Sequence, residues 1–136
     1  MNHSVAGIAF EEGKVFIARR KMGGDLGGKW EFPGGKAEAG ETDADALRRE
    51  FLEEFGVAVT AGPLLGSGEF SHNGRRFALN AYRIFFDSRA LCLTEHDEWR
   101  WAAFEEIEAL DFAGSDRLLL PSLQAYFEGN AGIKNR

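Results

Sequence analysis

Cysteine is nearly absent from this sequence, and a long apolar run is missing altogether. Cys92 is the one cysteine among 136 residues, which excludes a disulfide within the chain and fits a reducing cytosol. No apolar run approaches the length of a membrane span, and the N-terminus has no basic, apolar and small signal pattern. We therefore expect a cytoplasmic protein without a membrane partner. The apolar stretch ALCL at 90–93 predicts that Cys92 is buried and structural.

Positive charge is also scarce. Sixteen Lys and Arg residues stand against 22 Asp and Glu residues, for a formal net charge of −6 at pH 7. Proteins that bind nucleic-acid polymers usually carry a basic face, so such a partner is not expected. A small phosphate-bearing substrate remains compatible with this balance, because bound metal ions can supply positive charge locally.

Repeats, linkers and low-complexity segments are missing as well. A chain of 136 residues with 44% hydrophobic content and twelve phenylalanines is expected to form one domain, 1–136, with a proper core. Residues 129–136 are expected to form a loose tail. The sequence leaves a monomer and a homodimer equally open.

Extended and helical segments follow one another in an order that predicts an α+β fold, with a mixed sheet sandwiched between helices. Strands are expected at residues 5–10, 15–19, 30–32, 57–70, 75–86 and 99–102. A glycine-rich loop is expected at 21–29, a turn at 33–35 and a hairpin at Asn73-Gly74. A helical turn is expected at 104–110 and a C-terminal amphipathic helix at 115–127, in addition to the helix described next.

The most informative stretch is residues 34–57, GGKAEAGETDADALRREFLEEFGV. Thr42 is a candidate helix N-cap, Asp45 resembles the second half of a weak capping box, and Gly56 is a typical C-terminal glycine. At about 100° per residue, one face of this helix carries apolar residues and is expected to be buried. These residues are Ala44, Leu47, Phe51 and Phe55.

A second face of the same helix carries three glutamates, Glu50, Glu53 and Glu54, at positions i, i+3 and i+4. Each close pair of ionised carboxylates costs on the order of 1 kcal/mol in water and about 4 kcal/mol at an effective dielectric of 20. Folding alone does not explain this arrangement, whereas a hard divalent cation such as Mg2+ would relieve the repulsion. We therefore predict a metal site in place of a solvated acidic face. Arg49 either forks onto these carboxylates to orient them or forms an ordinary surface ion pair.

The same stretch matches a known motif at every defining position. The matching residues are Gly35, Glu41, Arg49-Glu50-Phe51, Glu53-Glu54 and Gly56-Val57. They form the Nudix box, and the chain resembles the Nudix hydrolases, which cleave a pyrophosphate bond in nucleoside diphosphate derivatives with Mg2+ or Mn2+. WEFPGGK at 30–36, EHDEWRW at 95–101 and FEEIEALDFAGSD at 104–116 resemble the MutT-type branch. This branch includes oxidised-guanine triphosphatases and CTP pyrophosphohydrolases.

The resemblance implies a set of metal ligands made of box glutamates and a glycine carbonyl: Glu50, Glu53, Glu54 and Gly35. A further glutamate from a late loop joins them, and Glu95 matches it through its spacing to Trp101. Glu98 is a second candidate, and the alternative for Glu95 is a solvated loop residue. Either Glu53 or Glu95 is the implied base that takes a proton from water, and Arg49 has the implied orienting role.

Contacts to the phosphates are expected from basic residues outside the box. Arg20 follows a strand and precedes the glycine-rich loop, which suits a polyphosphate contact, and Lys36 is a second candidate. The alternative for Arg20 is a surface charge at the end of a strand. Arg75 or Arg76, after the Asn73-Gly74 turn, could approach the base or the phosphates.

For the base, Phe32 resembles the stacking aromatic of the family, with a core phenylalanine as its alternative. Asp116 stands where the oxidised-guanine branch has an asparagine that reads the base edge. This difference matters because an amide donates and accepts hydrogen bonds, while an ionised carboxylate only accepts. The alternative for Asp116 is a helix cap, because Ser115-Asp116 is expected to open a helix.

The implied activity is metal-assisted conversion of a nucleoside triphosphate and water to a nucleoside monophosphate and pyrophosphate. Oxidised or cytosine-type nucleotides are the implied substrates, and Mg2+ is the implied cofactor, with Mn2+ able to substitute. A first alternative is a Nudix hydrolase of another derivative, such as a dinucleoside polyphosphate or a nucleotide sugar. A second alternative is a non-catalytic module that only binds nucleotides, although no box glutamate is lost here.

Overall fold

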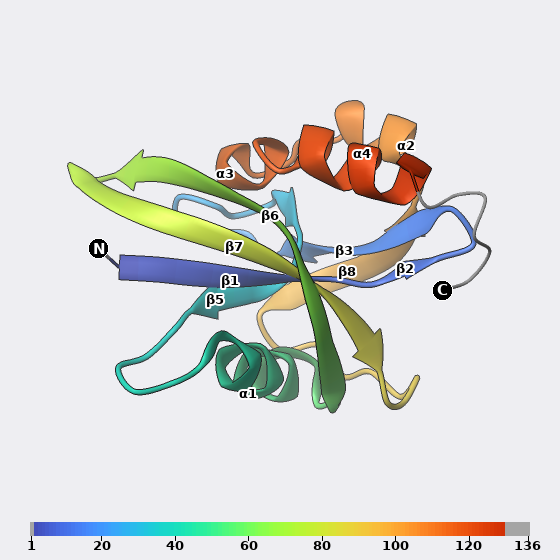
Figure 1. Cartoon of the computed structure of the whole chain (residues 1–136), viewed down its shortest axis with the longest axis horizontal. Helices are drawn as coiled ribbons and strands as arrows, with labels where there is room; N and C mark the ends of the chain where they lie inside the picture. Colours follow the sequence, from blue (N-terminus) through green and yellow to red (C-terminus); the bar gives the residue numbers. More distant parts are fainter. Residues whose placement is uncertain (1, 130–136) are drawn as a thin grey trace.

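The computed structural model of the chain describes residues 2–129, which form two β-sheets between two layers of helices. Helix α1 (Asp43–Phe55) covers one side (Figure 1). The other side is covered by α2 (Phe104–Glu108), α3 (Gly114–Arg117) and α4 (Leu120–Gly129). This arrangement confirms the predicted α+β sandwich. Among the described residues, no helix is both long and apolar enough to cross a membrane.

The first sheet has the strand order β5-β1-β7-β6. Its strands are β1 (Asn2–Ile8), β5 (Gly34–Lys36), β6 (Val59–His72) and β7 (Arg75–Phe86). The β1–β7 pair is parallel and the other pairs are antiparallel, so the sheet is mixed as predicted. The predicted hairpin at Asn73-Gly74 is confirmed, with positive φ values of 52° and 75° that suit the turn.

The second sheet is built around β3 (Lys14–Arg20), which pairs antiparallel with each of its neighbours. These neighbours are β2 (Phe10–Glu11), β4 (Trp30–Glu31) and β8 (His96–Ala102). The β3–β8 pairing is irregular between Arg19 and Arg20, where the register shifts and Arg20 comes to lie opposite His96.

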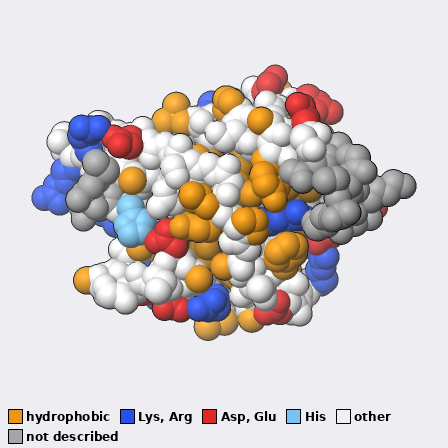
Figure 2. Space-filling model, in the orientation of Figure 1, with side chains coloured by type: hydrophobic (Ala, Val, Ile, Leu, Met, Phe, Trp, Pro, Cys, Tyr) orange, Lys and Arg blue, Asp and Glu red, His pale blue; other side chains and the backbone are white. Residues whose placement is uncertain are grey.

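Two apolar clusters hold the layers together. One joins α1 to the sheets through Phe51 and Phe55, which pack with Phe16. The other lies under α4 and includes Leu123 and Phe127. The face drawn in Figure 2 mixes apolar side chains with charged side chains of both signs.

Several predicted boundaries differ from the structure; β8, for example, begins at His96, before the predicted strand at 99–102. The expected turn at 33–35 is mostly strand β5, because Gly34 pairs with Ala6 at the edge of the first sheet. The expected helix at 115–127 is two helices, α3 and α4, which are separated at residues 118–119. Pro121 has no N–H with which to continue the helical hydrogen bonds across this point. The predicted loose tail lies outside the described residues, except for Gly129, which ends α4.

The prediction that Cys92 is buried is wrong, because its side chain is exposed. The ALCL run lies in the irregular segment between β7 and β8, where apolar residues need not all face the core. Leu91 packs against the core, while Cys92 is held by its backbone, whose N–H donates to the carbonyl of Phe55 at 2.9 Å.

Candidate metal and nucleotide site

Helix α1 begins and ends where its caps predict. The Thr42 hydroxyl oxygen accepts a hydrogen bond from the backbone N–H of Asp45 at 3.1 Å. Gly56 adopts the left-handed conformation, and its N–H donates to the carbonyl of Leu52 at 2.9 Å. The predicted apolar face is buried except for Ala44, which is only partly buried, while Ala46 is fully buried. The inward face is therefore rotated slightly from the predicted one.

The three glutamates of α1 differ in exposure. The side chain of Glu53 is 59% exposed, that of Glu50 is 15% exposed and that of Glu54 is 4% exposed. Burial, followed by the nearby carboxylates of Glu50, Glu31 and Glu95, raises the pKa of Glu54 well above its ordinary value. Its Oε1 atom is buried without a hydrogen-bond partner. Such a carboxyl group needs a proton or a cation, so it fits the predicted role of metal ligand.

Gly35 lies directly against the carboxylate of Glu50. A Cβ atom added to Gly35 would lie 2.5 Å from the Glu50 carboxylate carbon, which is closer than real contacts allow. The neighbouring Gly34 faces backbone, because its Cβ would lie 1.9 Å from the carbonyl oxygen of Val5. The two glycines therefore have separate roles: Gly34 allows β5 to pack on β1, and Gly35 leaves room for a site carboxylate.

This difference gives a prediction for two matched variants. Gly35→Ala is expected to displace the Glu50 side chain and lower kcat about 10- to 100-fold, because small misplacements of catalytic groups are costly. Gly34→Ala is expected to lower the melting temperature instead, since overpacking against backbone costs about 1–3 kcal/mol. Steady-state kinetics and thermal denaturation of both variants check this, and equal melting temperatures with equal kcat would contradict it.

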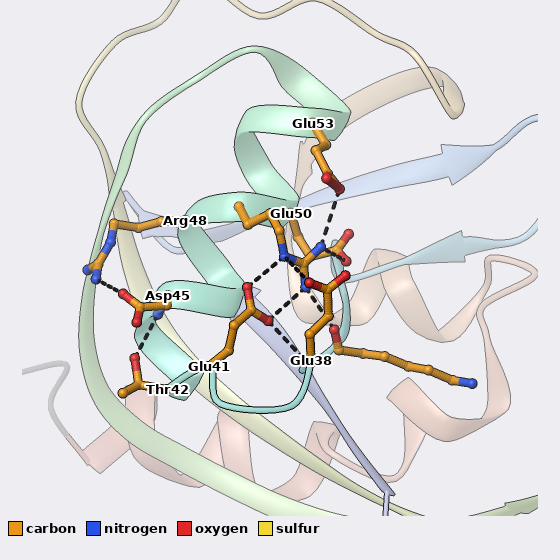
Figure 3. Close-up of polar contacts among 9 residues, drawn as sticks. Glu38, Glu41, Thr42, Asp45, Arg48, Glu50 and Glu53 are labelled. Carbon is orange, nitrogen blue, oxygen red and sulfur yellow. Dashed lines mark hydrogen bonds and ion pairs between the residues drawn. The ribbon is translucent and has the colours of Figure 1, made fainter.

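Arg49 donates hydrogen bonds to several carboxylates, among them those of Glu41, Glu50 and Glu53, which are labelled in Figure 3. It donates to both oxygens of Glu41, from Nε at 2.7 Å and from Nη2 at 3.0 Å. Its Nη1 donates to Glu50 at 2.9 Å and to Glu53 at 3.3 Å, and Nη2 also donates to the carbonyl of Lys36 at 3.0 Å. The hydrogen bonds from Arg49 lower the pKa of Glu41 to about 2. An orienting role requires forked contacts of this kind, and an isolated surface ion pair would not include so many hydrogen bonds.

The loop before β8 is tied to the C-terminal end of α1. The Thr94 hydroxyl donates to the carbonyls of Glu53 and Glu54, each at 3.1 Å. The carbonyl of Glu95 accepts from the N–H of Lys21 at 3.1 Å, while the Glu95 side chain is exposed. These contacts bring Glu95 close enough to raise the pKa of Glu54. Glu98 instead lies near Arg19 and Arg100, each at 3.5 Å, which makes it the weaker candidate.

The predicted phosphate contacts are divided between the two sheets. Arg20 ends β3, and its Nη1 donates to Glu31 at 3.3 Å, so it is not a free charge at a strand end. Lys36 ends β5, with its ammonium 5.1 Å from the ring centre of Phe77. Arg75 and Arg76 are exposed at the start of β7.

The predicted base contacts differ from expectation. Phe32 is 2% exposed and packs edge-on against Phe112, with ring centres 5.1 Å apart. The structure therefore favours the core alternative for Phe32 over an open stacking platform. Asp116 caps no helix, because α3 begins at Gly114 and its N-cap, Ala113, makes no side-chain cap bond.

Asp116 instead connects α3 to the segment before the box. Its Oδ2 accepts from the backbone N–H of Phe32 at 2.8 Å, and the residue is only 7% exposed. Burial, followed by repulsion from Glu31, raises the pKa of Asp116 to about 7. The carboxyl group can therefore be present in either protonation state near neutral pH.

Two buried ionisable residues of the site, Glu31 and His96, were not predicted. His96 Nε2 lies 2.8 Å from Glu31 Oε2, and His96 Nδ1 lies 3.7 Å from Glu54 Oε1. Glu31, Glu54 and His96 form a cluster whose ligand atoms lie within 4.8 Å of one another. Glu31 lies between the buried aromatic residues Trp30 and Phe32, so no alternation in the sequence signals its orientation.

The fold and the box residues on helix α1 together define a hydrolase of the type that the box predicts. Residues 1–123 match the NUDIX domain, and the chain belongs to the Nudix family, whose hydrolases generally use a divalent metal and act on nucleotides. The CTP pyrophosphohydrolase of Escherichia coli strain K12 is 34% identical over 122 residues, which cover 90% of this chain and 88% of that protein.

Two further comparisons agree. The 8-oxo-dGTP diphosphatase of Proteus vulgaris is 40% identical over 83 residues, which cover 60% of this chain and 74% of that protein. The solution structure of the E. coli ORF135 protein has a TM-score of 0.81 at 33% identity and covers 100% of this chain and 95% of that one. The predicted Nudix resemblance and fold are confirmed.

Proposed function

We propose that this protein is a MutT-type nucleoside triphosphate pyrophosphohydrolase that uses Mg2+, with Mn2+ able to substitute, and acts on oxidised or cytosine-type nucleotides. The observation that carries the proposal is the set of three glutamates on α1, whose side chains differ in exposure. Gly35 lies against Glu50, and Arg49 donates hydrogen bonds to both Glu50 and Glu53. The relatives named for CTP and for 8-oxo-dGTP support the substrate class. We propose the cytosol as its compartment, on the ground of the single cysteine.

The proposed ligands are Glu50, Glu53, Glu54, Glu95 and the Gly35 carbonyl. When bound, the divalent metal supplies the positive charge that neutralises the phosphates and stabilises the leaving group. Glu53 or Glu95 accepts a proton from the attacking water, and these two are the exposed glutamates among the proposed ligands. The water oxygen bonds to the β-phosphorus, and the bond from this phosphorus to the oxygen bridging to the α-phosphate breaks. Pyrophosphate and a nucleoside monophosphate are the products.

Other residues position the substrate in this proposal. Arg20 and Lys36 contact the phosphates, and Arg49 keeps the glutamates in place through its hydrogen bonds. Asp116 lies at the base edge, and Arg75 approaches the base or the phosphates from the β6–β7 hairpin. Phe32 supports the base site from the core by donating its N–H to Asp116.

A panel of canonical, oxidised and methylated nucleoside triphosphates tests the proposal. With Mg2+, the expected products are a nucleoside monophosphate and pyrophosphate, detected by chromatography. Calcium is expected to bind but to support turnover poorly, because it holds a looser geometry than Mg2+. Including a dinucleoside polyphosphate and a nucleotide sugar distinguishes another Nudix substrate. Binding without any pyrophosphate release would instead indicate a nucleotide-binding module.

A further inference from the structure

Behind the proposed metal ligand Glu54 lies a buried histidine whose two ring nitrogens both face carboxylates. His96 is fully buried, and it stacks on the core ring of Phe55 with ring centres 5.1 Å apart and an interplanar angle of 15°. Its Nε2 edge faces Glu31 at 2.8 Å and its Nδ1 edge faces Glu54 at 3.7 Å. The ring is thus fixed in the core and offers one edge to each carboxylate.

No hydrogen bond joins His96 to Glu54 across the 3.7 Å between Nδ1 and Oε1. Nδ1 of His96 and Oε1 of Glu54 are both buried and have no hydrogen-bond partner. Leaving buried polar atoms unpaired costs free energy, so each such pair calls for an explanation. Hydrogen bonds in ligand-free sites are often long and tighten only when the ligands bind.

We propose that His96 is a positioning residue that fixes the orientation of Glu54 through its Nδ1 edge. In metalloproteins, partners behind the metal ligands set ligand orientation, and their loss typically weakens metal binding about 10- to 100-fold. This inference rests on the proposed function, because it takes Glu54 to be a metal ligand.

Glu31 contacts the other edge of the His96 ring. Its Oε2 faces His96 and also accepts from Arg20 Nη1 at 3.3 Å. Arg20 and His96 lie opposite each other where the β3–β8 register shifts, and such bulges re-aim side chains next to functional sites. The buried residues Glu31 and His96 therefore connect Arg20, a proposed phosphate contact, to Glu54, a proposed metal ligand.

Two substitutions separate the two edges of the ring. His96→Asn places its amide near the former Nδ1, facing Glu54, while His96→Gln places its amide near the former Nε2, facing Glu31. We expect His96→Gln to weaken Mn2+ binding without nucleotide about 10- to 100-fold, and His96→Asn to retain most of the wild-type affinity. Mn2+ titrations followed by electron paramagnetic resonance measure this, with thermal denaturation as the check on folding.

A measurement on the wild-type chain keeps the test independent of variant folding. The ring-nitrogen chemical shifts of His96 should move when Mg2+ is added, and they should not move in Glu54→Gln. Variants of His3 and His72 assign the signals, since the chain has three histidines. Equal Mn2+ affinity of both His96 variants, or unmoved shifts in the wild type, would overturn the inference. Failure of the proposed function is distinguished by wild-type protein that releases no pyrophosphate in the substrate panel.

Discussion

Replacing Glu54 by glutamine is expected to lower kcat at least about 100-fold while the melting temperature stays equal or rises. The loss in rate follows because a ligated metal contributes several kcal/mol of transition-state stabilisation, and each tenfold in rate corresponds to about 1.36 kcal/mol. Stability is retained because the variant removes a buried carboxyl group that lies beside Glu50, Glu31 and Glu95. Glu53→Gln is expected to lose most activity in the same way.

The difference in melting temperature between Glu54→Gln and the wild type should depend on pH. Because the pKa of Glu54 is raised in the folded state, the folded protein binds a proton that the unfolded chain loses above about pH 4. The stability that this proton contributes is full below that pH and is lost as pH rises. In a chelator, the melting temperature of Glu54→Gln should therefore exceed that of the wild type more at about pH 8 than at about pH 5.

Bound metal should change this difference in melting temperature in the opposite direction, in favour of the wild type. Mn2+ or Mg2+ binds only where the folded helix gathers the carboxylates, so it should raise the wild-type melting temperature by mass action and raise that of Glu54→Gln less. Glu105→Gln, at an exposed position on α2, is the matched control and should behave as the wild type. Near-normal turnover of Glu54→Gln at saturating Mg2+ would show that Glu54 is not needed as a ligand.

Local signals in the sequence were enough to predict the helix that carries these glutamates. The Thr42 cap, the Gly56 terminus and the Asn73-Gly74 hairpin each depend on a few adjacent residues, and all three are observed. The bounds of β7, Arg75–Phe86, also agree with prediction, because turn residues mark its start and an alternating apolar pattern runs along it.

What the sequence did not predict depends on contacts between distant segments. His96 faces Glu54 and Glu31 because of where β8 pairs with β3 and shifts register, which no local pattern specifies. The bond between Asp116 and Phe32 joins residues 84 positions apart, so the capping motif around Asp116 was misleading. Cys92 is exposed for a related reason, since its apolar run lies in an irregular connection rather than in a strand.

The base preference of the enzyme is expected to change with pH through Asp116. An ionised carboxylate accepts from the exocyclic amino group of cytosine but repels the O6 acceptor of guanine, whereas a protonated one can donate to O6. Since burial raises the pKa of Asp116 to about 7, both forms occur near neutral pH. The ratio of kcat/KM for CTP over that for 8-oxo-dGTP should therefore increase from about pH 6 to about pH 8.

Asp116→Asn should remove this pH dependence and shift preference toward 8-oxo-dGTP. The amide can accept from the N7–H of the oxidised base and donate to its O6. A reading pair of this kind is worth roughly 1–3 kcal/mol, so the ratio should move at least several-fold. The amide oxygen can still accept from the Phe32 N–H, which should preserve the connection between α3 and the box segment.

Two further variants separate base reading from structure. Asp116→Ala loses the acceptor for the Phe32 N–H and should lower the melting temperature, since an unpaired buried donor costs about 1–3 kcal/mol. Asp111→Asn changes an exposed carboxylate in the same segment, one that pairs with Lys29, and should leave the substrate ratio unchanged. If Asp116→Asn leaves both the ratio and its pH dependence unchanged while Asp116→Ala is destabilised, Asp116 only anchors Phe32. The base would then be selected by other residues, with Arg75 and Arg76 at the hairpin as the next to vary.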